Sequence, residues 1–489
     1  MSRFGRQRVT ARAVVDLRST PLVDTAIALA RLASVVAFAL FLPGLAAAQS
    51  PQSPVPIQLP KALVFPNYDN VHLGKDQALE GGAYIARAGD ASANFYNPAG
   101  LVHSERSSLN ASSTGWEWTK LSSQALNKSV TSSKIDNVPG YFGIVIGPPL
   151  ISNRDIRVGL SLTRLVSWSP GNLDFTSTTT GVPGLDRFTN SASSNFSTTL
   201  YQAAVAWAPV GDRSLRLGAS FGVADTSYSS AGTLSGLVTT GGTPGQFSST
   251  LRVNGNDWAL VFGAGMQWDV VAGLTIGALV RLPGVSISNG SLVTYESSVI
   301  TTTLSPQTSF VSDDTGEFHY KLPLEAGLGI AYTFGNAQVE ADVRYHEAVP
   351  MYDFYRTNVP LQFTTFAGGT TSVTTQPLPP FQYSARRVFN VSVGGNYKLG
   401  KLATLHGGFY TSMSPVANPD TSPLRHADLY GVTGGVDFQF EHFGASIGAG
   451  YEWGSAASTP IGIDGQVLQG GNGVSLQSLS ILYAISYLF

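Results

Sequence analysis

The sequence predicts an all-β protein, a membrane β-barrel of about fourteen antiparallel strands with an N-terminal hatch segment in its lumen. Three observations predict it: apolar residues alternate with small ones, connections alternate between short and long, and charge is scarce. Charged residues make up 12% of the 489 residues, 53 residues are glycine, and the mean hydropathy is +0.09. This composition suits a protein with two differently wetted surfaces.

The C-terminal stretch LQSLSILYAISYLF shows the alternation most clearly. Its odd positions, from Leu479 to Phe489, are aliphatic or aromatic, whereas its even positions include Ser478, Ser480 and Ser486. Side chains two residues apart share one face of a strand, so one face is continuously apolar. A soluble sandwich also alternates, but its polar face is richer in Lys and Glu than these strands are. The pattern therefore favours a wall between lipid and a lumen.

Fourteen such segments follow Ser107, and an even number is what a single-chain bacterial barrel requires. Their predicted centres are residues 113, 144, 162, 202, 220, 263, 278, 327, 342, 393, 408, 435, 448 and 482. Tight turns are expected at 211–214, 269–273, 335–337, 399–401 and 441–442. Long loops rich in Ser, Thr, Gly and Pro are expected near 170–195, 230–255, 284–317 and 348–385. Short turns on one side and long loops on the other are typical of outer-membrane barrels.

The prediction divides the chain into four parts. Residues 1–48 hold six arginines, the apolar run LASVVAFALFL and the exit AAAQS, as a secretory signal peptide does. The apolar run is too short for a membrane anchor, which needs about 20 residues. Residues 49–75 form a Pro-rich linker, residues 76–104 form the hatch, and residues 105–489 form the transmembrane barrel. Without residues 1–48 the chain keeps 23 basic and 29 acidic residues, which argues against nucleic acid as a partner.

The hatch precedes the first predicted strand and cannot belong to the wall. Its sequence, DQALEGGAYIARAGDASANFYNPAGL, is low in charge, contains aromatic residues such as Phe95 and Tyr96, and carries an Asn-Pro turn signal. We therefore expect it to fold back into the lumen as a plug rather than to extend into the periplasm.

By the same alternation, a charged row faces the lumen in the segment QVEADVRYHEA. The predicted lumenal charges are Arg281, Glu325, Glu340, Asp342, Arg344 and His346. Two interpretations stay open: the row handles the head group of a ligand or water, or it is a paired and hydrated barrel wall.

One segment breaks the alternation. In RVGLSLTRLVSW, the third predicted strand, the lipid-facing row contains Arg164 between Leu162 and Val166, and it ends at Trp168. A cation on the lipid side costs about 2 to 4 kcal/mol at mid-membrane. Either Arg164 snorkels to an interface, which the lack of a flanking glycine favours, or a bulge or kink turns the strand inward.

Motifs that would indicate catalysis or metal binding are weak. Residues 444–448, GASIG, fit the pattern around a hydrolase nucleophile, here Ser446, but they lie in an alternating strand that no helix follows. Cysteine is absent, the seven histidines form no pair at helix spacing, and no carboxylates have the spacing of a calcium loop. We therefore expect no enzyme, no cofactor and no metal site.

Three stretches and the last residue carry a resemblance to a known family. They are ARAGDASANFYNPAGL, HGGFYTSMSPV, LRHADLYGVTGGVDF and the terminal Phe489. In these stretches the chain resembles the FadL/TodX outer-membrane transporters for long-chain fatty acids and other hydrophobic compounds. The resemblance implies a monomeric fourteen-stranded barrel whose hatch element plugs the lumen near an inward kink in the third strand. The hatch element is Asn97, Pro98, Ala99 and Gly100.

The resemblance also implies a function. An apolar substrate would be captured from outside, bind in lumenal pockets, and leave sideways through the kink into the membrane. Our candidates for ligand contacts are Phe95, Tyr96, Arg164 and Trp168. We expect passive uptake of fatty acids or aromatic hydrocarbons in the outer membrane of a Gram-negative bacterium, with outer-membrane lipid around the barrel. The barrel-assembly machinery would recognise Phe489.

Other functions remain as alternatives. A general diffusion porin for small polar solutes would have charged constriction loops and no packed hatch, and the low charge of residues 81–101 speaks against it. A barrel lipase and an adhesive role of the long loops are further possibilities. The sequence does not distinguish one lipophilic substrate from another, because all need an apolar pocket.

Overall fold

The structure is a computed structural model that describes residues 66–489 apart from several short stretches. Those stretches are residues 70–72, 124–127, 136–139, 149, 152, 170–172, 178–184, 241–242, 302–305, 418–426, 457–461, 464–465 and 468–473. The predicted signal peptide and most of the predicted linker lie outside the described residues.

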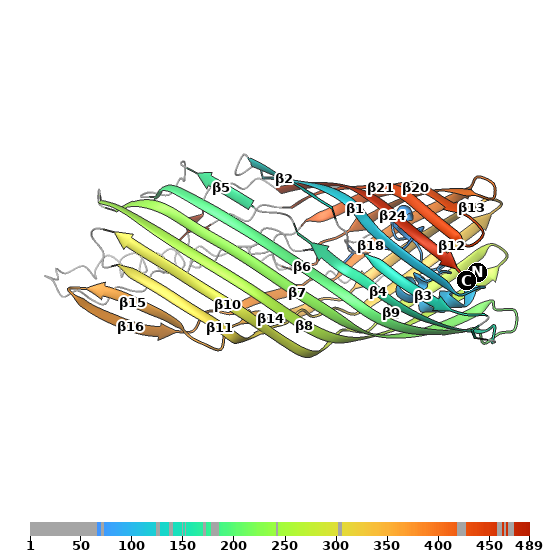
Figure 1. The fold of residues 1–489 in the computed structure, drawn as a ribbon, viewed down its shortest axis with the longest axis horizontal. Coiled ribbons are helices and arrows are strands. Elements are labelled where there is room, and N and C mark those ends of the chain that lie inside the picture. The colour runs from blue at the N-terminus through green and yellow to red at the C-terminus, as the bar shows by residue number, and fades with distance from the viewer. Residues whose placement is uncertain are drawn as a thin grey trace, which may run out of the picture. The chain divides into compact units, whose positions relative to one another are not determined.

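Fourteen antiparallel strands close into a barrel (Figure 1). The first, β1 (Ser108–Ser123), pairs with the last, β24 (Val474–Leu488), and so completes the wall. In order around the wall, the others are β3 (Tyr141–Ile146), β4 (Ile156–Trp168), β6 (Leu185–Trp207), β7 (Leu215–Thr240), β8 (Thr243–Val271), β9 (Leu274–Arg281), β12 (Glu325–Phe334), β13 (Ala337–His346), β18 (Val388–Lys398), β19 (Ala403–Ser412), β20 (Asp428–Gln439) and β21 (Phe443–Ala456). Each predicted centre falls inside one of these strands, so the predicted fold class and strand count are confirmed.

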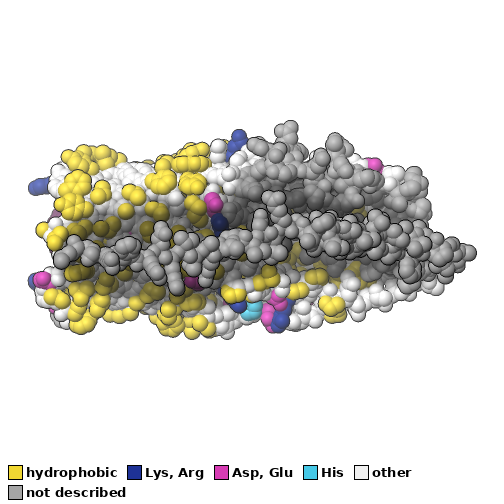
Figure 2. Space-filling view, turned by 180° about the vertical axis from the view of Figure 1, so that it is seen from behind, with side chains coloured by type: hydrophobic (Ala, Val, Ile, Leu, Met, Phe, Trp, Pro, Cys, Tyr) yellow, Lys and Arg dark blue, Asp and Glu magenta, His cyan; other side chains and the backbone are white. Residues whose placement is uncertain are grey.

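The two faces of the wall differ as the alternation predicts. In β24 the side chains of Leu479, Ile481 and Tyr483 are exposed on the outside, whereas Ser478 and Ser480 are buried against the lumen. Figure 2 shows hydrophobic side chains gathered over the end of the barrel that carries the short turns. An apolar outer band of this kind is the surface that a membrane barrel presents to lipid.

The predicted tight turns all lie at one end of the barrel. They join β6 to β7, β8 to β9, β12 to β13, β18 to β19 and β20 to β21. Gly273 and Gly400 in these turns have φ angles of +83° and +90°, a region that glycine enters without steric cost. We call the half of the lumen at this end the lower lumen, and the opposite half the upper lumen.

The stretches predicted to be long loops are mostly strand, so the loop prediction is wrong there. The strands β6, β7 and β8 contain 23, 26 and 29 residues, although about 9 to 11 tilted residues cross a bilayer. The additional strands are β2 (Lys128–Lys134), β5 (Leu173–Ser177), β10 (Val285–Thr301), β11 (Gln307–Phe318), β14 (Val349–Arg356), β15 (Leu361–Ala367), β16 (Thr370–Gln376) and β17 (Phe381–Ala385), with a separate hairpin of β22 (Gly462–Ile463) and β23 (Gln466–Val467).

These additional strands escaped prediction because they do not separate lipid from a lumen. The side chains of β16 are exposed along almost its whole length, so its sequence has no reason to alternate. In the long extensions of β7 and β8, hydroxyl pairs between neighbouring strands stabilise the sheet instead, such as Thr233 and Thr250 with their oxygens 3.2 Å apart.

The third wall strand, β4, carries a β-bulge at Leu165. Arg164 pairs with Thr199 and Val166 pairs with Thr198, so Leu165 is an extra residue in the ladder. An extra residue reverses the alternation after it: Arg164 stays on the outer face, whereas Val166 and Trp168 pack in the lumen. Of the two alternatives left open, the bulge is present, but it follows Arg164 and leaves that residue on the outer face. The assignment of Val166 and Trp168 to the lipid-facing row is therefore wrong.

The hatch lies in the lower lumen as three short helices. They are η1 (Gln77–Glu80), α2 (Ala93–Tyr96) and η2 (Pro98–His103). Asn97 caps η2 by accepting a hydrogen bond from the Ala99 backbone N–H at 3.2 Å, and Pro98 takes the first helical position, where proline is favoured. The predicted lumenal hatch is thus confirmed. None of the described helices is long and apolar enough to cross a membrane.

Candidate functional site: the hatch and the lumen above it

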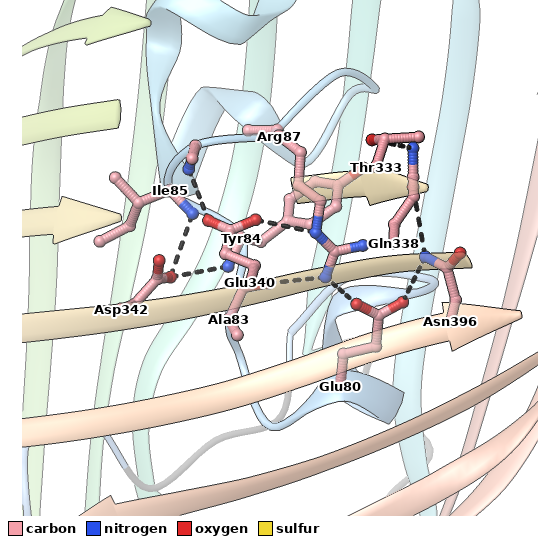
Figure 3. Close-up of polar contacts among 12 residues, drawn as sticks. Glu80, Ala83, Tyr84, Ile85, Arg87, Thr333, Gln338, Glu340, Asp342 and Asn396 are labelled. Carbon is pink, nitrogen blue, oxygen red and sulfur yellow. Dashed lines mark hydrogen bonds and ion pairs between the residues drawn. The ribbon is translucent and has the colours of Figure 1, made fainter. Parts of the chain in front are cut away.

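Two carboxylates of β13 hold the hatch backbone (Figure 3). The backbone N–H groups of Tyr84 and Ile85 donate to Asp342 Oδ2 at 2.7 and 3.1 Å, and that of Ala86 donates to Glu340 Oε1 at 2.5 Å. Both carboxylate residues are only 1% exposed. Glu340 and Asp342 therefore dock the hatch, a role that neither interpretation of the lumenal charges anticipated.

A buried chain of charges extends this docking to neighbouring strands. Arg87 Nε donates to Glu340 Oε2 at 2.8 Å, and its guanidinium also pairs with Glu80. Asn396 Nδ2 donates to Glu80 Oε1 at 3.0 Å, and His406 Nδ1 lies 2.6 Å from the same oxygen (Asn396 is drawn in Figure 3). Burial opposes ionisation of Glu80, but its hydrogen bond with His406 and the charge of Arg87 hold the pKa of Glu80 below its ordinary value. The hatch is thereby bonded to β13, β18 and β19.

The hatch element contacts a different part of the wall from the one the resemblance implies. Asn97 Nδ2 donates to the backbone carbonyls of Met266 in β8 at 2.9 Å and Ala278 in β9 at 3.3 Å. Hydrogen bonds to the third wall strand involve other hatch residues: Asn94 Nδ2 lies 3.4 Å from the Leu160 carbonyl oxygen, and Arg157 Nε donates to the Ser104 carbonyl oxygen at 2.8 Å. Asn94 and Ser104 are thus hatch residues that are hydrogen-bonded to the strand carrying the bulge.

Glycines of the wall allow the hatch to lie directly against it. A Cβ on Gly277 would lie 2.5 Å from the carbonyl oxygen of Ile85, closer than real Cβ atoms approach. Within the hatch, Gly100 lies against the Ala88 backbone in the same way. The other wall glycines at which an added Cβ would meet hatch atoms are Gly159, Gly218, Gly265, Gly327, Gly329, Gly394, Gly408, Gly435 and Gly448. This close approach explains why the lumenal face of the wall is rich in glycine.

The remaining predicted lumenal charges form a second network at the upper side of the hatch. Arg281 pairs with Glu325 and donates to the Phe95 carbonyl oxygen at 3.0 Å. Arg344 Nη1 lies 3.6 Å from Glu325 Oε1, and its guanidinium carbon lies 5.1 Å from the ring centre of Tyr96. The hatch aromatics are thus packed against two buried arginines.

Lumenal contacts begin before the predicted hatch boundary. Asp69, in the stretch predicted to be linker, lies 3.1 Å from His346 Nε2 and accepts a hydrogen bond from Asn390 Nδ2 at 2.6 Å. Asn67 donates to the carbonyl oxygen of Ser412 at 2.6 Å. His346 therefore contacts Asp69 and does not take part in the docking contacts of Glu340 and Asp342.

The upper lumen is filled by apolar side chains from strands that are distant in sequence, which we call the upper aromatic cluster. At its centre, the ring of Phe354 lies 4.9 Å from Phe318, 5.3 Å from Tyr228 and 6.1 Å from Tyr383, measured between centroids. Its buried members are Tyr68, Val166, Phe196, Leu251, Val253, Val293, Tyr295, Val311, Phe318, Tyr320, Val349, Tyr352, Phe354, Tyr355, Leu361, Phe363, Leu378, Tyr383, Ala385, Val388 and Val416, and Trp168 and Tyr228 pack against them. Apolar contact of this kind is non-directional and accepts apolar ligands of varied shape.

A cavity of about 50 Å³ lies between the hatch and the upper aromatic cluster. Phe95, Tyr96, Leu165, Tyr68 and Arg344 are among the residues that line it. Of the four candidates for ligand contacts, Phe95 and Tyr96 line this cavity, Trp168 packs against the upper aromatic cluster, and Arg164 lies on the outer face.

Among the described residues, the strand pairing of the wall is interrupted beside the bulge. The short strand β3 pairs with β1 up to Ser112 and with β4 up to Thr163. Beyond these residues β1 pairs with β2, and β4 and β5 pair with β6. Within the described part of the chain, no pairing joins β1 or β2 to β4 or β5 above β3. Leu165, which lines the cavity, lies at this interruption.

Sequence reasoning missed several residues that hold the hatch. Glu80 and Arg87 carry charge in the hatch stretch, which was selected for its low charge, and their isolation could have identified them. Asp69 lies in the stretch predicted to be linker. His406 precedes two glycines in an alternating strand, so its lumenal orientation was predictable, although its partner was not. Ser446 lies within β21, where its hydroxyl is 3.4 Å from the Lys75 carbonyl oxygen.

No protein-family model and no curated protein sequence matches the chain. Solved structures do match it. The toluene transporter TodX of Pseudomonas putida is 15% identical with a TM-score of 0.52, over 85% of this chain and 98% of that one. The toluene transporter TbuX of Ralstonia pickettii is 13% identical with a TM-score of 0.51, over 86% and 99%. A FadL homologue of Pseudomonas aeruginosa is 14% identical with a TM-score of 0.50, over 88% and 99%. The chain therefore has the fold of the FadL-type barrels, as the resemblance in its sequence predicted.

Proposed function

We propose that this protein is an outer-membrane channel for the passive uptake of hydrophobic compounds. The observation that carries the proposal is the division of the lumen: an aromatic upper half above a lower half that a buried hatch occupies. A porin for polar solutes needs the opposite, an open and polar lumen. The toluene transporters that share this fold support the same assignment.

The substrate leaves sideways, through the interruption of the wall beside Leu165. An apolar chain gains about 0.8 kcal/mol per buried CH₂ group, so release into periplasmic water would oppose much of its binding energy. Exit into lipid avoids this cost. The bulge, the cavity that Leu165 lines and the lack of described pairing between β1 and β4 above β3 support this route.

The substrates are aromatic hydrocarbons or long-chain fatty acids, and the protein catalyses no reaction. It works as a monomer in the outer membrane of a Gram-negative bacterium. Its C-terminal Phe489, which faces outward at the end of the last strand, is recognised by the barrel-assembly machinery.

Deletion of Leu165 tests the sideways exit. The residues on either side already pair with neighbouring residues of β6, so the deletion leaves a regular ladder. Uptake of radiolabelled toluene and oleate by cells that express the variant should fall to the level of cells without the protein. The matched control is deletion of Ile287, the extra residue of a bulge in β10, which should leave uptake unchanged.

Uptake that survives the deletion of Leu165, in a barrel that reaches the outer membrane in normal amounts, would refute exit at this site. Equal loss of uptake in both deletions would mean that any bulge is needed for a working barrel, and would also count against a specific exit.

A further inference from the structure

We propose that a divalent transition-metal ion such as Zn²⁺ binds where the hatch meets β19 and β20, held by Asp76, His406 and Asp437. One donor atom from each of these residues lies within 4.8 Å of the other two. One imidazole and two carboxylates are a ligand set that Zn²⁺ accepts, with a fourth position left for water. The three residues are far apart in the sequence, so no motif indicates the site.

The orientation of His406 supports metal binding. Its Nδ1 lies 2.6 Å from Glu80 Oε1, whereas its Nε2 has no hydrogen-bond partner among the residues that the structure describes. The side chain is 2% exposed, so water does not satisfy this nitrogen readily. Histidines that bind metals commonly hold a carboxylate through one ring nitrogen and the metal through the other. Glu80 and His406 already have this arrangement.

Lys75 occupies the place of the ion in the metal-free protein. Its Nζ lies 2.8 Å from Asp437 Oδ1 and 3.3 Å from Asp76 Oδ1. The single positive charge of Lys75 balances only one of the two carboxylates. A divalent ion in place of the ammonium group would balance both. Ligand atoms around tetrahedral zinc lie about 3.3 Å apart, so binding requires that the three side chains close in and that Lys75 moves away. The side chain of Asp76 is 26% exposed and provides the entry.

The ion would join the hatch to the wall. Asp76 directly precedes η1 of the hatch, whereas His406 and Asp437 belong to two wall strands. Because the site is complete only when the hatch is docked, metal binding stabilises the docked state by mass action. This inference does not depend on the proposed transport function.

Titration of the full barrel with Zn²⁺ tests the site. The protein, folded in detergent, freed of any affinity tag and stripped with EDTA, is followed by isothermal titration calorimetry. We expect one ion per wild-type chain, at least tenfold tighter binding by Lys75→Met because the competing ammonium is gone, and loss of this binding in His406→Gln. His442→Gln, at an exposed histidine in the β20–β21 turn, is the matched control and should bind as the wild type does.

Two results would overturn the proposal. If neither the wild type nor Lys75→Met binds Zn²⁺, Lys75 is the permanent cation of the cluster and there is no metal site. If His406→Gln binds as tightly as the wild type, the ion lies elsewhere. The Lys75→Met variant keeps the test valid even if His406→Gln fails to fold, because it predicts a gain of affinity. Visible absorption of bound Co²⁺ in Lys75→Met gives a second readout, which should show tetrahedral coordination.

Discussion

The lower and upper halves of the lumen are built on different physical principles. In the lower lumen, Glu340, Asp342 and Asn97 form directional hydrogen bonds between hatch and wall, and wall glycines allow backbone contact. In the upper lumen, aromatic rings such as Phe318 and Phe354 pack without directional bonds. Directional bonds are lost when one partner shifts, whereas apolar contacts tolerate rearrangement. The lower half is therefore suited to closing the barrel, and the upper half is suited to admitting a lipophilic molecule.

The largest expected effect comes from removal of both docking carboxylates. In Glu340→Gln with Asp342→Asn, each carboxyl group becomes an amide with a single acceptor oxygen. Buried donors of the hatch such as the Ala86 N–H and Arg87 Nε then compete for one acceptor, at a cost of about 1 to 3 kcal/mol for each donor left without one. We expect sugar influx into cells to rise at least tenfold. Glu441→Gln, at a turn carboxylate whose side chain is 87% exposed, is the control. If sugar influx in the double variant equals that of the wild type, these carboxylates do not hold the hatch.

A smaller rise in sugar influx should follow when the close contact between the hatch and the wall is lost. In Gly277→Ala the new methyl group would lie 2.5 Å from the Ile85 carbonyl oxygen, so the hatch must move. Sugar influx should rise severalfold. Gly290→Ala places the same methyl group in open space on β10 and should leave influx at the wild-type level. Equal influx in the two variants would argue that the glycine contacts are incidental.

A change in the upper lumen should affect toluene uptake and not sugar influx. Phe318→Asn puts an amide into the upper aromatic cluster, where an unpaired polar group costs about 1 to 3 kcal/mol. We expect toluene uptake to fall severalfold while sugar influx stays low. Phe310→Asn, on the same strand but half exposed, is the matched control. If Phe318→Asn instead admits sugar, the two halves of the lumen are not independent.

Lowering the pH should have the smallest effect on sugar influx. The pKa of Glu80 is held below its ordinary value of 4.5, so its pairs with Arg87 and His406 add stability at pH values above about 4.5 and lose it as the pH falls through the lowered pKa. The contribution of Glu80 to docking should therefore be lost as the pH falls below about 4.5, and sugar influx through reconstituted barrels should rise there. A rise near pH 6 would show that Glu80 does not set the response.

Sequence predicted the wall strands because each separates an apolar exterior from a small-residue lumen, as Leu479 and Ser480 illustrate. It failed where that constraint ends. Residues 370–376 form β16 although both faces are exposed, and Val166 and Trp168 were assigned to the wrong face because one bulge residue shifts every later position. A pattern with a period of two cannot reveal a single inserted residue before the pairing is known.

The position of the candidate site in the lumen was predicted from the sequence, but its hydrogen bonds and ion pairs were not. The hatch was placed in the lumen from its low charge and aromatic residues, and Arg281, Glu325 and Arg344 were assigned to the lumen by alternation. That Asp342 accepts backbone N–H groups of the hatch, or that Glu80 meets His406 across 326 positions, depends on how the hatch is threaded. Alternation fixes the side of a strand on which a residue lies, but not which hatch atom it contacts.

The most direct measurement compares the uptake of labelled toluene and of a labelled sugar of similar size by cells that express the wild-type protein and by cells that lack it. A sealed lower lumen below an apolar upper lumen predicts faster toluene uptake with no change in sugar uptake. Faster sugar uptake with unchanged toluene uptake would contradict this account and would identify an ordinary porin.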